Sequence, residues 1–180
     1  MEKGKVILAK QKFNLTLDRL CQQLIENYGD FSDTCIVGIQ EKGALFSDRL
    51  ITHLEAFGQV PKLKYGKLDI TFFRDDFRRG RSLTPSKNEM DFIVEGKKVI
   101  LLDDVLYTGR TIQSAMNALQ QLGRPDSVEL MVFVDRRFNR HLPIQPNYVG
   151  ITVDALNEAY VRVYWSEHSD KDEILFFDDK

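Results

Sequence analysis

Apolar residues recur along this chain at two different spacings, and the spacing predicts which segments form helices and which form strands. Over residues 16–28 the apolar positions recur every three to four residues, which predicts an amphipathic helix that ends at Gly29. The same spacing predicts a second helix around residues 46–54 and a third over residues 112–122, which Gly123 and Pro125 end. These helices alternate with apolar runs of a different kind.

Short apolar runs between the helices predict buried strands. They are residues 35–39 (CIVGI), 68–73 (LDITFF), 98–102 (KVILL) and 128–134 (VELMVFV), with two shorter candidates at 148–151 and 160–164. Strands that alternate with helices at these lengths form β-α-β units. We therefore predict an α/β fold with a mainly parallel, twisted sheet flanked by helices, built as a single domain from residues 1–180.

The composition is that of an ordinary globular chain and argues against several classes of protein. In 180 residues, 43% are hydrophobic and 29% are charged, and 25 basic residues face 27 acidic ones, for a net charge of −2. Such a balance argues against a generic cationic surface for nucleic acid. No apolar run approaches the ~20 residues of a membrane span, and the first residues do not read as a signal peptide.

Cysteine and histidine usage agrees with a chain that folds in a reducing compartment. Cys21 and Cys35 stand in apolar contexts, so we interpret them as core thiols rather than as a disulfide. His53, His141 and His168 lack the spacing of a zinc site and are interpreted as surface or packing residues. The expected location is the cytoplasm, with no membrane partner.

One long polar segment interrupts the alternation of strands and helices. Residues 74–91 read RDDFRRGRSLTPSKNEMD, without periodicity and with four arginines, Arg74, Arg78, Arg79 and Arg81. A gap of this length inside a compact domain is typical of a functional loop, and a solvated β-hairpin without a role is the alternative. The gathered arginines favour the functional loop.

The segment with the clearest chemistry is residues 99–111, VILLDDVLYTGRT, in which a buried strand ends in Asp103 and Asp104 and a Thr-Gly-Arg-Thr turn opens a helix. In parallel sheets, ligands bind at the carboxyl ends of strands. Backbone N–H groups at a helix amino terminus suit a phosphate, with Gly109 permitting close approach, while carboxylates suit sugar hydroxyls or a hydrated Mg²⁺. The combination indicates a ribose 5-phosphate site, and the alternative is an ordinary strand end followed by a turn.

These thirteen residues closely resemble the signature with which type I phosphoribosyltransferases bind 5-phosphoribosyl-1-pyrophosphate (PRPP). Further blocks resemble the PyrR family in order and spacing, namely LDIT at 68–71, RDD at 74–76, GRP at 123–125, VDR at 134–136 and LPI at 142–144. The resemblance runs from residues 6–8 to residues 174–176. PyrR proteins regulate pyrimidine operons and also have uracil phosphoribosyltransferase activity. We therefore expect the type I fold, with the flexible loop of residues 74–91 over the active site.

The resemblance also implies roles for individual residues. Its catalytic set is Arg74, which meets the departing pyrophosphate, and Asp103 and Asp104, which meet the ribose hydroxyls and hold Mg²⁺ indirectly, through water or substrate. The residues that bind PRPP and its phosphates are Gln40, Glu41, Lys42, Gly43, Val105, Leu106, Tyr107, Thr108, Gly109, Arg110 and Thr111. Family members usually carry a more basic tetrapeptide at residues 40–43, so Gln40 and Glu41 imply weaker charge complementarity to pyrophosphate.

The resemblance places the nucleobase site at Asp135, Arg136, Tyr148 and Val149. Hypoxanthine-guanine relatives carry an aspartate at the position of Tyr107 and a lysine at about the position of Asp135, so this chain disfavours a 6-oxopurine. Asp135 would accept a hydrogen bond from the uracil ring N–H, Arg136 would donate one to a uracil carbonyl, and Tyr148 would stack on the base. The alternative for Tyr148 and Val149 is a place in the strand core.

The expected reaction is the Mg²⁺-dependent transfer of the phosphoribosyl group from PRPP to uracil, which gives UMP and pyrophosphate. The alternative is a regulator that binds messenger RNA when loaded with UMP or UTP and keeps only residual catalysis. A protein that only senses PRPP or nucleotides is a third, weaker alternative. Catalysis would come from orienting two substrates and stabilising the leaving group, because no Ser-His-Asp or Cys-His pattern supplies a nucleophile.

RNA binding is disfavoured by departures from the RNA-binding relatives. Gln145 stands in place of an arginine and Ile151 in place of a lysine. Arg136, Arg137 and Arg140 remain, and their alternative roles are to serve the substrate or to lie in a solvated loop. Each lost phosphate contact lowers the affinity for RNA, so we expect RNA attenuation to be weak or absent. A homodimer or a larger homo-oligomer is expected from the resemblance, with residues 68–73 and 174–177 as interface material or, alternatively, as core.

Overall fold

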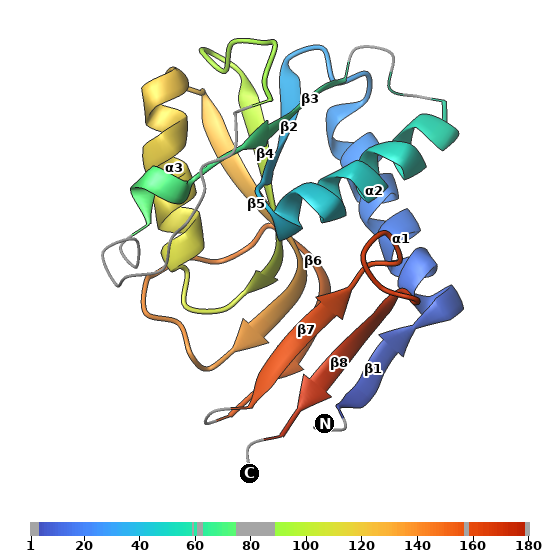
Figure 1. Cartoon of the computed structure of the whole chain (residues 1–180). Coiled ribbons are helices and arrows are strands. Elements are labelled where there is room, and N and C mark those ends of the chain that lie inside the picture. The colour runs from blue at the N-terminus through green and yellow to red at the C-terminus, as the bar shows by residue number, and fades with distance from the viewer. Residues whose placement is uncertain (1–3, 59, 61–62, 75–88, 157–158, 179–180) are drawn as a thin grey trace.

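The main sheet is parallel throughout the residues that the structure describes. A computed structural model describes residues 4–58, 60, 63–74, 89–156 and 159–178. Within them the strand order is β3-β2-β4-β5-β6 (Figure 1), with all neighbouring pairs parallel. The strands are β2 (Thr34–Ile39), β3 (Lys64–Leu68), β4 (Lys98–Leu106), β5 (Ser127–Arg137) and β6 (Tyr148–Asp154). This arrangement confirms the predicted fold class.

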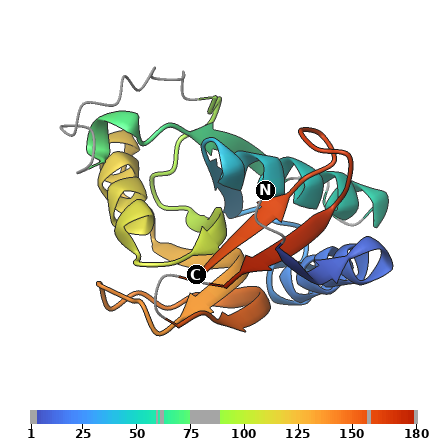
Figure 2. The same cartoon turned by 60° about the horizontal axis from the view of Figure 1, so that its bottom comes forward.

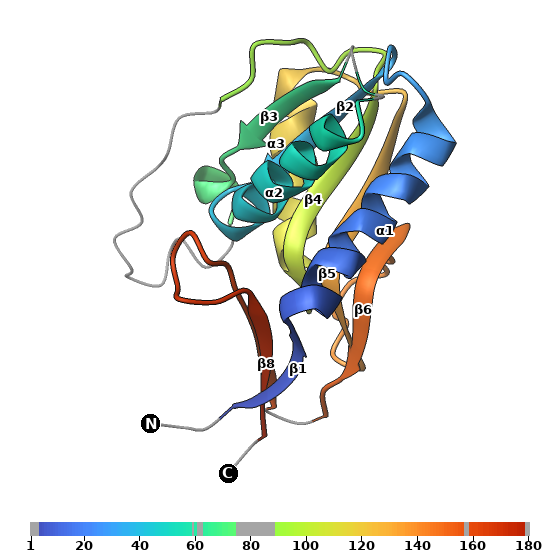
Figure 3. The same ribbon diagram turned by 90° about the vertical axis from the view of Figure 1, so that its right-hand side faces the viewer.

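Helices cover both faces of this sheet. Helices α1 (Lys10–Tyr28) and α2 (Lys42–Ala56) lie on one face, and α3 (Arg110–Leu122) lies on the other (Figures 1 and 3). In β4, Ile100 and Leu102 join the core beneath α1 and α2, whereas the alternate residues join the core beneath α3. Because both faces are buried, these strands are continuous apolar runs rather than alternating ones.

A small antiparallel sheet, β1-β8-β7, lies beyond the carboxyl ends of the parallel strands and comes forward in Figure 2. Its strands are β1 (Lys5–Ala9), β7 (Tyr160–Tyr164) and β8 (Glu173–Phe177). Trp165, which follows β7, packs its ring 5.2 Å from that of Phe13, 5.3 Å from that of Phe133 and 5.9 Å from that of Phe46. This aromatic cluster fixes the small sheet to the main core.

Two predicted element boundaries are wrong. The first helix begins at Lys10 rather than at residue 16, and its early residue Phe13 is fully buried. The predicted strand over residues 68–73 is not one, because β3 ends at Leu68. The Asp69 carboxylate accepts hydrogen bonds from the Thr71 N–H (2.8 Å) and hydroxyl (2.6 Å) and turns the chain out of the sheet into a 3₁₀ turn, Thr71–Phe73.

Three further expectations concern the two cysteines, the long polar segment and membrane-spanning helices. Cys21 and Cys35 are buried and free, which confirms them as core thiols, and burial raises the pKa of Cys21 to about 12 and that of Cys35 to about 11. Of the long polar segment, residues 75–88, with Arg78, Arg79 and Arg81, lie outside the described residues. Among the helices that are described, none is both long and apolar enough to cross a membrane.

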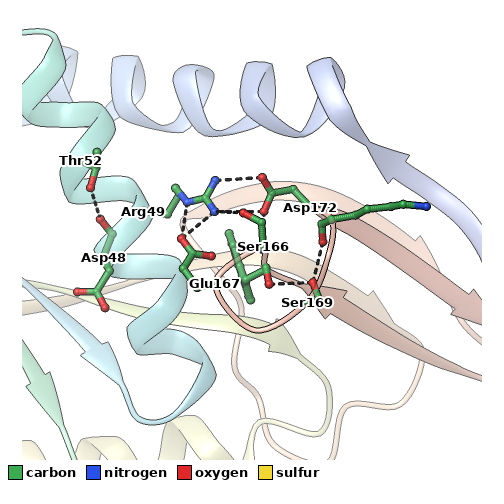
Figure 4. Close-up of polar contacts among 9 residues, drawn as sticks. Asp48, Arg49, Thr52, Ser166, Glu167, Ser169 and Asp172 are labelled. Carbon is green, nitrogen blue, oxygen red and sulfur yellow. Dashed lines mark hydrogen bonds and ion pairs between the residues drawn. The ribbon is translucent and has the colours of Figure 1, made fainter.

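Arg49 of α2 ties the turn after β7 to the main body of the protein (Figure 4). Its guanidinium donates hydrogen bonds to Glu167 (2.8 Å), to both oxygens of Asp172 (3.1 and 3.2 Å) and to the Ser166 hydroxyl (2.9 Å). The Arg49 side chain is only 17% exposed and that of Asp172 only 21%. These contacts lower the pKa of Asp172, so the carboxylate stays charged and the turn is held at neutral pH.

We expect the Arg49→Met variant to lose about 1–3 kcal/mol of the free energy of unfolding, because it leaves the partly buried Asp172 carboxylate without its guanidinium donor. Methionine keeps the aliphatic stem of the side chain. Urea unfolding measures the difference. Arg137→Met is the control, because it removes an equally bidentate but half-exposed pair with Asp154 and should change stability less. Equal losses of stability in the two variants would contradict the role of Arg49 in holding the turn after β7.

Candidate active site

Asp103 and Asp104 lie near the carboxyl end of β4 and are nearly buried, each 6% exposed. Oδ1 of Asp103 accepts a hydrogen bond from the Asp104 N–H at 2.9 Å. Oδ2 of Asp104 has no hydrogen-bond partner among the described residues. Buried polar atoms are rarely left in this state. This acid pair therefore offers an acceptor at a place where a ligand would supply the donor.

Burial raises the pKa of both carboxyls of the acid pair. The pKa of Asp103 is raised further by the charge of Asp104, and the Lys42 ammonium acts on both in the opposite direction. Two like charges in a water-poor site disfavour ionisation. A ligand with hydrogen-bond donors, or a cation, relieves this repulsion.

Residues 40–43, which we call the pyrophosphate loop after their predicted role, follow β2 and include the first two residues of α2, with a cis peptide bond between Gln40 and Glu41. Gly43 brings the start of α2 against the acid pair, because a Cβ on Gly43 would lie 2.5 Å from the Leu102 carbonyl oxygen and 3.0 Å from the Asp103 Cα. No other residue fits this contact. The structure thus brings Lys42 and Gly43 close to the two carboxylates.

Residues 107–111, which we call the phosphate loop after their predicted role, follow β4 and open α3. Gly109 has φ +90°, a conformation that favours glycine, and its carbonyl accepts the first helical bond, from Gln113 N–H at 3.0 Å. The Thr108 hydroxyl accepts the Arg110 N–H at 3.4 Å. Leu106 is in the core, so only its backbone is available to a ligand. The amino terminus of α3 therefore presents N–H groups and a positive dipole next to the acid pair.

Asp135 and Arg136 lie at the same edge, since Asp135 pairs with Leu106 across β4 and β5. Arg136 is only 5% exposed, and its guanidinium carbon lies 3.8 Å from the centre of the Tyr107 ring. Nε of Arg136 is buried, with no partner in the part of the chain that the structure describes. A buried guanidinium with an unused donor beside the phosphate loop points to a ligand acceptor.

Tyr148 and Val149 are not brought to this edge. In the parallel register Tyr148 lies opposite Met131, whereas Asp135 lies opposite Thr152. Tyr148 is 7% exposed, and its hydroxyl accepts a hydrogen bond from Asn27. These positions favour the alternative role of both residues in the core. Arg74 is exposed and directly follows the 3₁₀ turn.

A cavity of about 710 Å³ adjoins the pyrophosphate loop. Glu41 and Lys42 line one side, and Arg162, Tyr164 and His168 line the other. Sequence reasoning missed the residues of β7. Arg162, Val163 and Tyr164 all line the cavity, so the alternation of polar and apolar residues along this strand gives no signal that would have identified them.

The donor set fits Mg²⁺ held indirectly. No cluster of three or more His, Cys, Asp or Glu side chains suited to a metal occurs among the described residues, so the site lacks a complete set of protein ligands. Mg²⁺ usually keeps several waters and is bound through one or two carboxylates and substrate phosphates. Asp103 and Asp104 match that requirement.

Comparison with known proteins agrees with this geometry. Residues 4–168 match the family model described as Phosphoribosyl transferase domain. A relative named Bifunctional protein PyrR, from Gloeothece citriformis, is 38% identical over 93% of this chain and 94% of its own length. Another of that name, from Clostridium novyi, is 38% identical over 99% of both.

Solved structures share the fold. A hypoxanthine phosphoribosyltransferase from Staphylococcus aureus superposes with a TM-score of 0.73 and 22% identity, over 97% of this chain and 91% of that one. The corresponding enzyme from Trypanosoma cruzi gives a TM-score of 0.71 and 15% identity, over 98% and 92%. At these identities the likeness concerns the architecture alone.

We expect Asp103→Asn to raise the free energy of unfolding of the free protein. Because the pKa of Asp103 is higher in the folded protein than in the unfolded chain, the stability linked to this group is present at low pH and is lost as pH rises through the folded pKa. The gain should therefore be larger at pH 8 than at pH 5 in urea unfolding. The exposed Asp126→Asn is the control, and an Asp103→Asn variant less stable than wild type at pH 8 would refute this expectation.

Proposed function

The chain belongs to the phosphoribosyl transferase domain family and, within it, to the PyrR family, and on this premise we propose that it transfers the phosphoribosyl group of PRPP to uracil. The observation that carries the proposal is the buried acid pair with an unused acceptor, Asp104 Oδ2, among the residues described. The phosphate loop follows the acid pair at the end of β4, and Gly43 of the pyrophosphate loop lies against its backbone. A ribose that carries a phosphate at C5 and a pyrophosphate at C1 fits this order of sites.

Each part of the site acts on a different part of PRPP. The ribose hydroxyls donate hydrogen bonds to Asp103 and Asp104, which stabilise the ionised carboxylates. The N–H groups of the phosphate loop bind the 5-phosphate. The backbone of residues 40–43, with Lys42 and Arg74, receives the pyrophosphate. When bound, Mg²⁺ supplies neutralising charge to the pyrophosphate oxygens, and the acid pair would hold it through water.

The chemical step exchanges one bond at ribose C1 for another. The bond from C1 to the pyrophosphate oxygen breaks, a bond from C1 to uracil N1 forms, and the N1 proton is released. No protein nucleophile takes part. The side chains orient the two substrates and stabilise the charge of the leaving group.

The base site is proposed at Asp135 and Arg136. Asp135 would accept the ring N–H of uracil, and the buried guanidinium of Arg136 would donate to a carbonyl. The solved structures of similar fold are titled hypoxanthine phosphoribosyltransferases, so a purine is the competing substrate. Tyr107, Asp135 and Arg136 are the residues that we propose discriminate between the two bases.

Release of pyrophosphate from PRPP and Mg²⁺ with each nucleobase tests this proposal. We expect turnover with uracil and little with hypoxanthine or guanine. Asp104→Asn should lower kcat/KM by about 10²–10³-fold, because it removes a charged acceptor of the ribose hydroxyls. The exposed Asp126→Asn serves as the control. Turnover with hypoxanthine or guanine but not with uracil would overturn the base assignment.

RNA binding is the second candidate, because the relatives are named bifunctional. The three arginines that the sequence analysis left for it are paired or buried. Arg137 pairs with Asp154, Arg140 pairs with Asp135 and Arg136 is buried. On α1, Arg19 donates to the Val149 and Gly150 carbonyls at 2.9 and 2.6 Å. We therefore propose that RNA attenuation is weak or lost.

A gel-shift experiment with pyrimidine-operon leader RNA tests this, with and without UMP. We expect binding no tighter than about 10⁻⁶ M at moderate salt, the range of non-specific contacts with phosphates, and no effect of UMP. Tight binding that requires UMP or UTP would instead establish the regulator.

Assembly is proposed as a homodimer or larger homo-oligomer. Of the two stretches considered as an interface, residues 68–73 include Phe72, which is 69% exposed. Residues 174–177 are more buried, with Ile174 fully buried and Phe177 only 7% exposed. The first stretch is therefore the better candidate for an interface.

A further inference from the structure

The chain after β5 lies against three consecutive residues of the phosphate loop. We name residues 139–144 the strap. Nη1 of Arg140 donates a hydrogen bond to the Tyr107 carbonyl. The His141 N–H donates to the Thr108 carbonyl at 3.0 Å. Ile144 closes on Gly109, since a Cβ there would lie 3.1 Å from Ile144 Cδ1. The strap thus fixes the backbone of the loop from outside.

Arg140 makes a second contact with a different part of the site. Its Nη2 donates to Asp135 Oδ1 at 2.5 Å, and the two side chains are only 22% and 15% exposed. Asp135 lies beside Leu106 across β4 and β5. One rigid guanidinium therefore bridges the backbone of the phosphate loop and the carboxylate proposed to read the base.

We propose that Arg140 is a positioning residue that couples the phosphate loop to Asp135, so that the ribose 5-phosphate and the base are bound as one unit. The inference rests on the proposed function and assigns a residue that the sequence did not place in the site. Arg140 acts through the groups it holds. With its carbonyl fixed, Tyr107 cannot rotate its peptide, and the N–H groups that follow stay directed at the phosphate.

Lysine cannot replace this bridge. The two contacts use different nitrogens of a planar guanidinium, whereas a lysine ammonium is a single point donor on a flexible chain. A lysine at position 140 would reach either the Tyr107 carbonyl or Asp135. The conservative variant therefore separates the coupling from the charge, because Arg140→Lys keeps the charge and loses one of the two contacts.

Steady-state kinetics with PRPP and uracil test the inference in Arg140→Gln and Arg140→Lys. We expect Arg140→Gln to raise the KM values for PRPP and for uracil, each by about tenfold, with kcat changed less than about threefold. Arg140→Lys should recover at most one of the two KM values. Arg137→Gln is the matched control, because this neighbouring arginine pairs with Asp154 away from the loop, and it should match wild type.

Three results would overturn the inference while leaving the proposed function intact. They are KM values in Arg140→Gln equal to those of Arg137→Gln, full recovery of both KM values by Arg140→Lys, and a fall in kcat with both KM values unchanged.

If the wild-type protein does not turn over uracil, the proposed function fails. Calorimetric binding of UMP and of ribose 5-phosphate then tests the positioning role of Arg140 separately. Weaker binding of both by Arg140→Gln supports the positioning role, and unchanged binding refutes it. Circular dichroism shows whether Arg140→Gln folds. If it does not, Arg140→Lys decides in the same titrations: weaker binding of at least one of the two ligands supports the positioning role, and unchanged binding of both refutes it.

Discussion

Two carboxylates side by side in a nearly buried strand end are the constraint around which the site is arranged. Burial and mutual repulsion both disfavour the ionised forms of Asp103 and Asp104. Neighbouring groups relieve this only in part, through the Asp104 N–H and the Lys42 ammonium. The free protein thus keeps an unfavourable electrostatic centre, which sugar hydroxyls are suited to relieve. Such sites trade stability for binding.

The parallel topology places the ligand groups around this centre. Strands β2, β4 and β5 end at the same edge, so the loops that follow them meet there, as is general for open parallel sheets. The loop after β2 brings Lys42 and Gly43, the loop after β4 brings backbone N–H groups, and the end of β5 brings Asp135. The small sheet adds a wall with Arg162 across the cavity from the pyrophosphate loop. Arg162 supplies positive charge to the cavity that Glu41 also lines, and Glu41 is, with Gln40, one of the two residues that depart from the basic family pattern.

Local patterns in the sequence predict much of this arrangement, and long-range contacts set the rest. The alternation of buried runs and amphipathic helices predicts the parallel sheet, and two acids after such a run predict the acid pair. The prediction of a strand over residues 68–73 was wrong because its apolar residues resemble those of a strand. In the structure, a hydrogen bond from the Thr71 N–H to Asp69 turns the chain out of the sheet. Tyr148 could not be placed from the motif, since only the β5–β6 register shows that it lies far from the edge. Arg140 contacts Tyr107, 33 residues away, and no local pattern encodes that contact.

Calorimetric titration with ribose 5-phosphate and with inorganic phosphate tests the central claim, that the acid pair binds the sugar. Wild type should bind ribose 5-phosphate at least about tenfold more tightly than phosphate, because the hydroxyls add charge-assisted hydrogen bonds to carboxylates. Asp104→Asn should bind both ligands almost equally. An Asp104→Asn variant that keeps the full preference for ribose 5-phosphate would contradict the account.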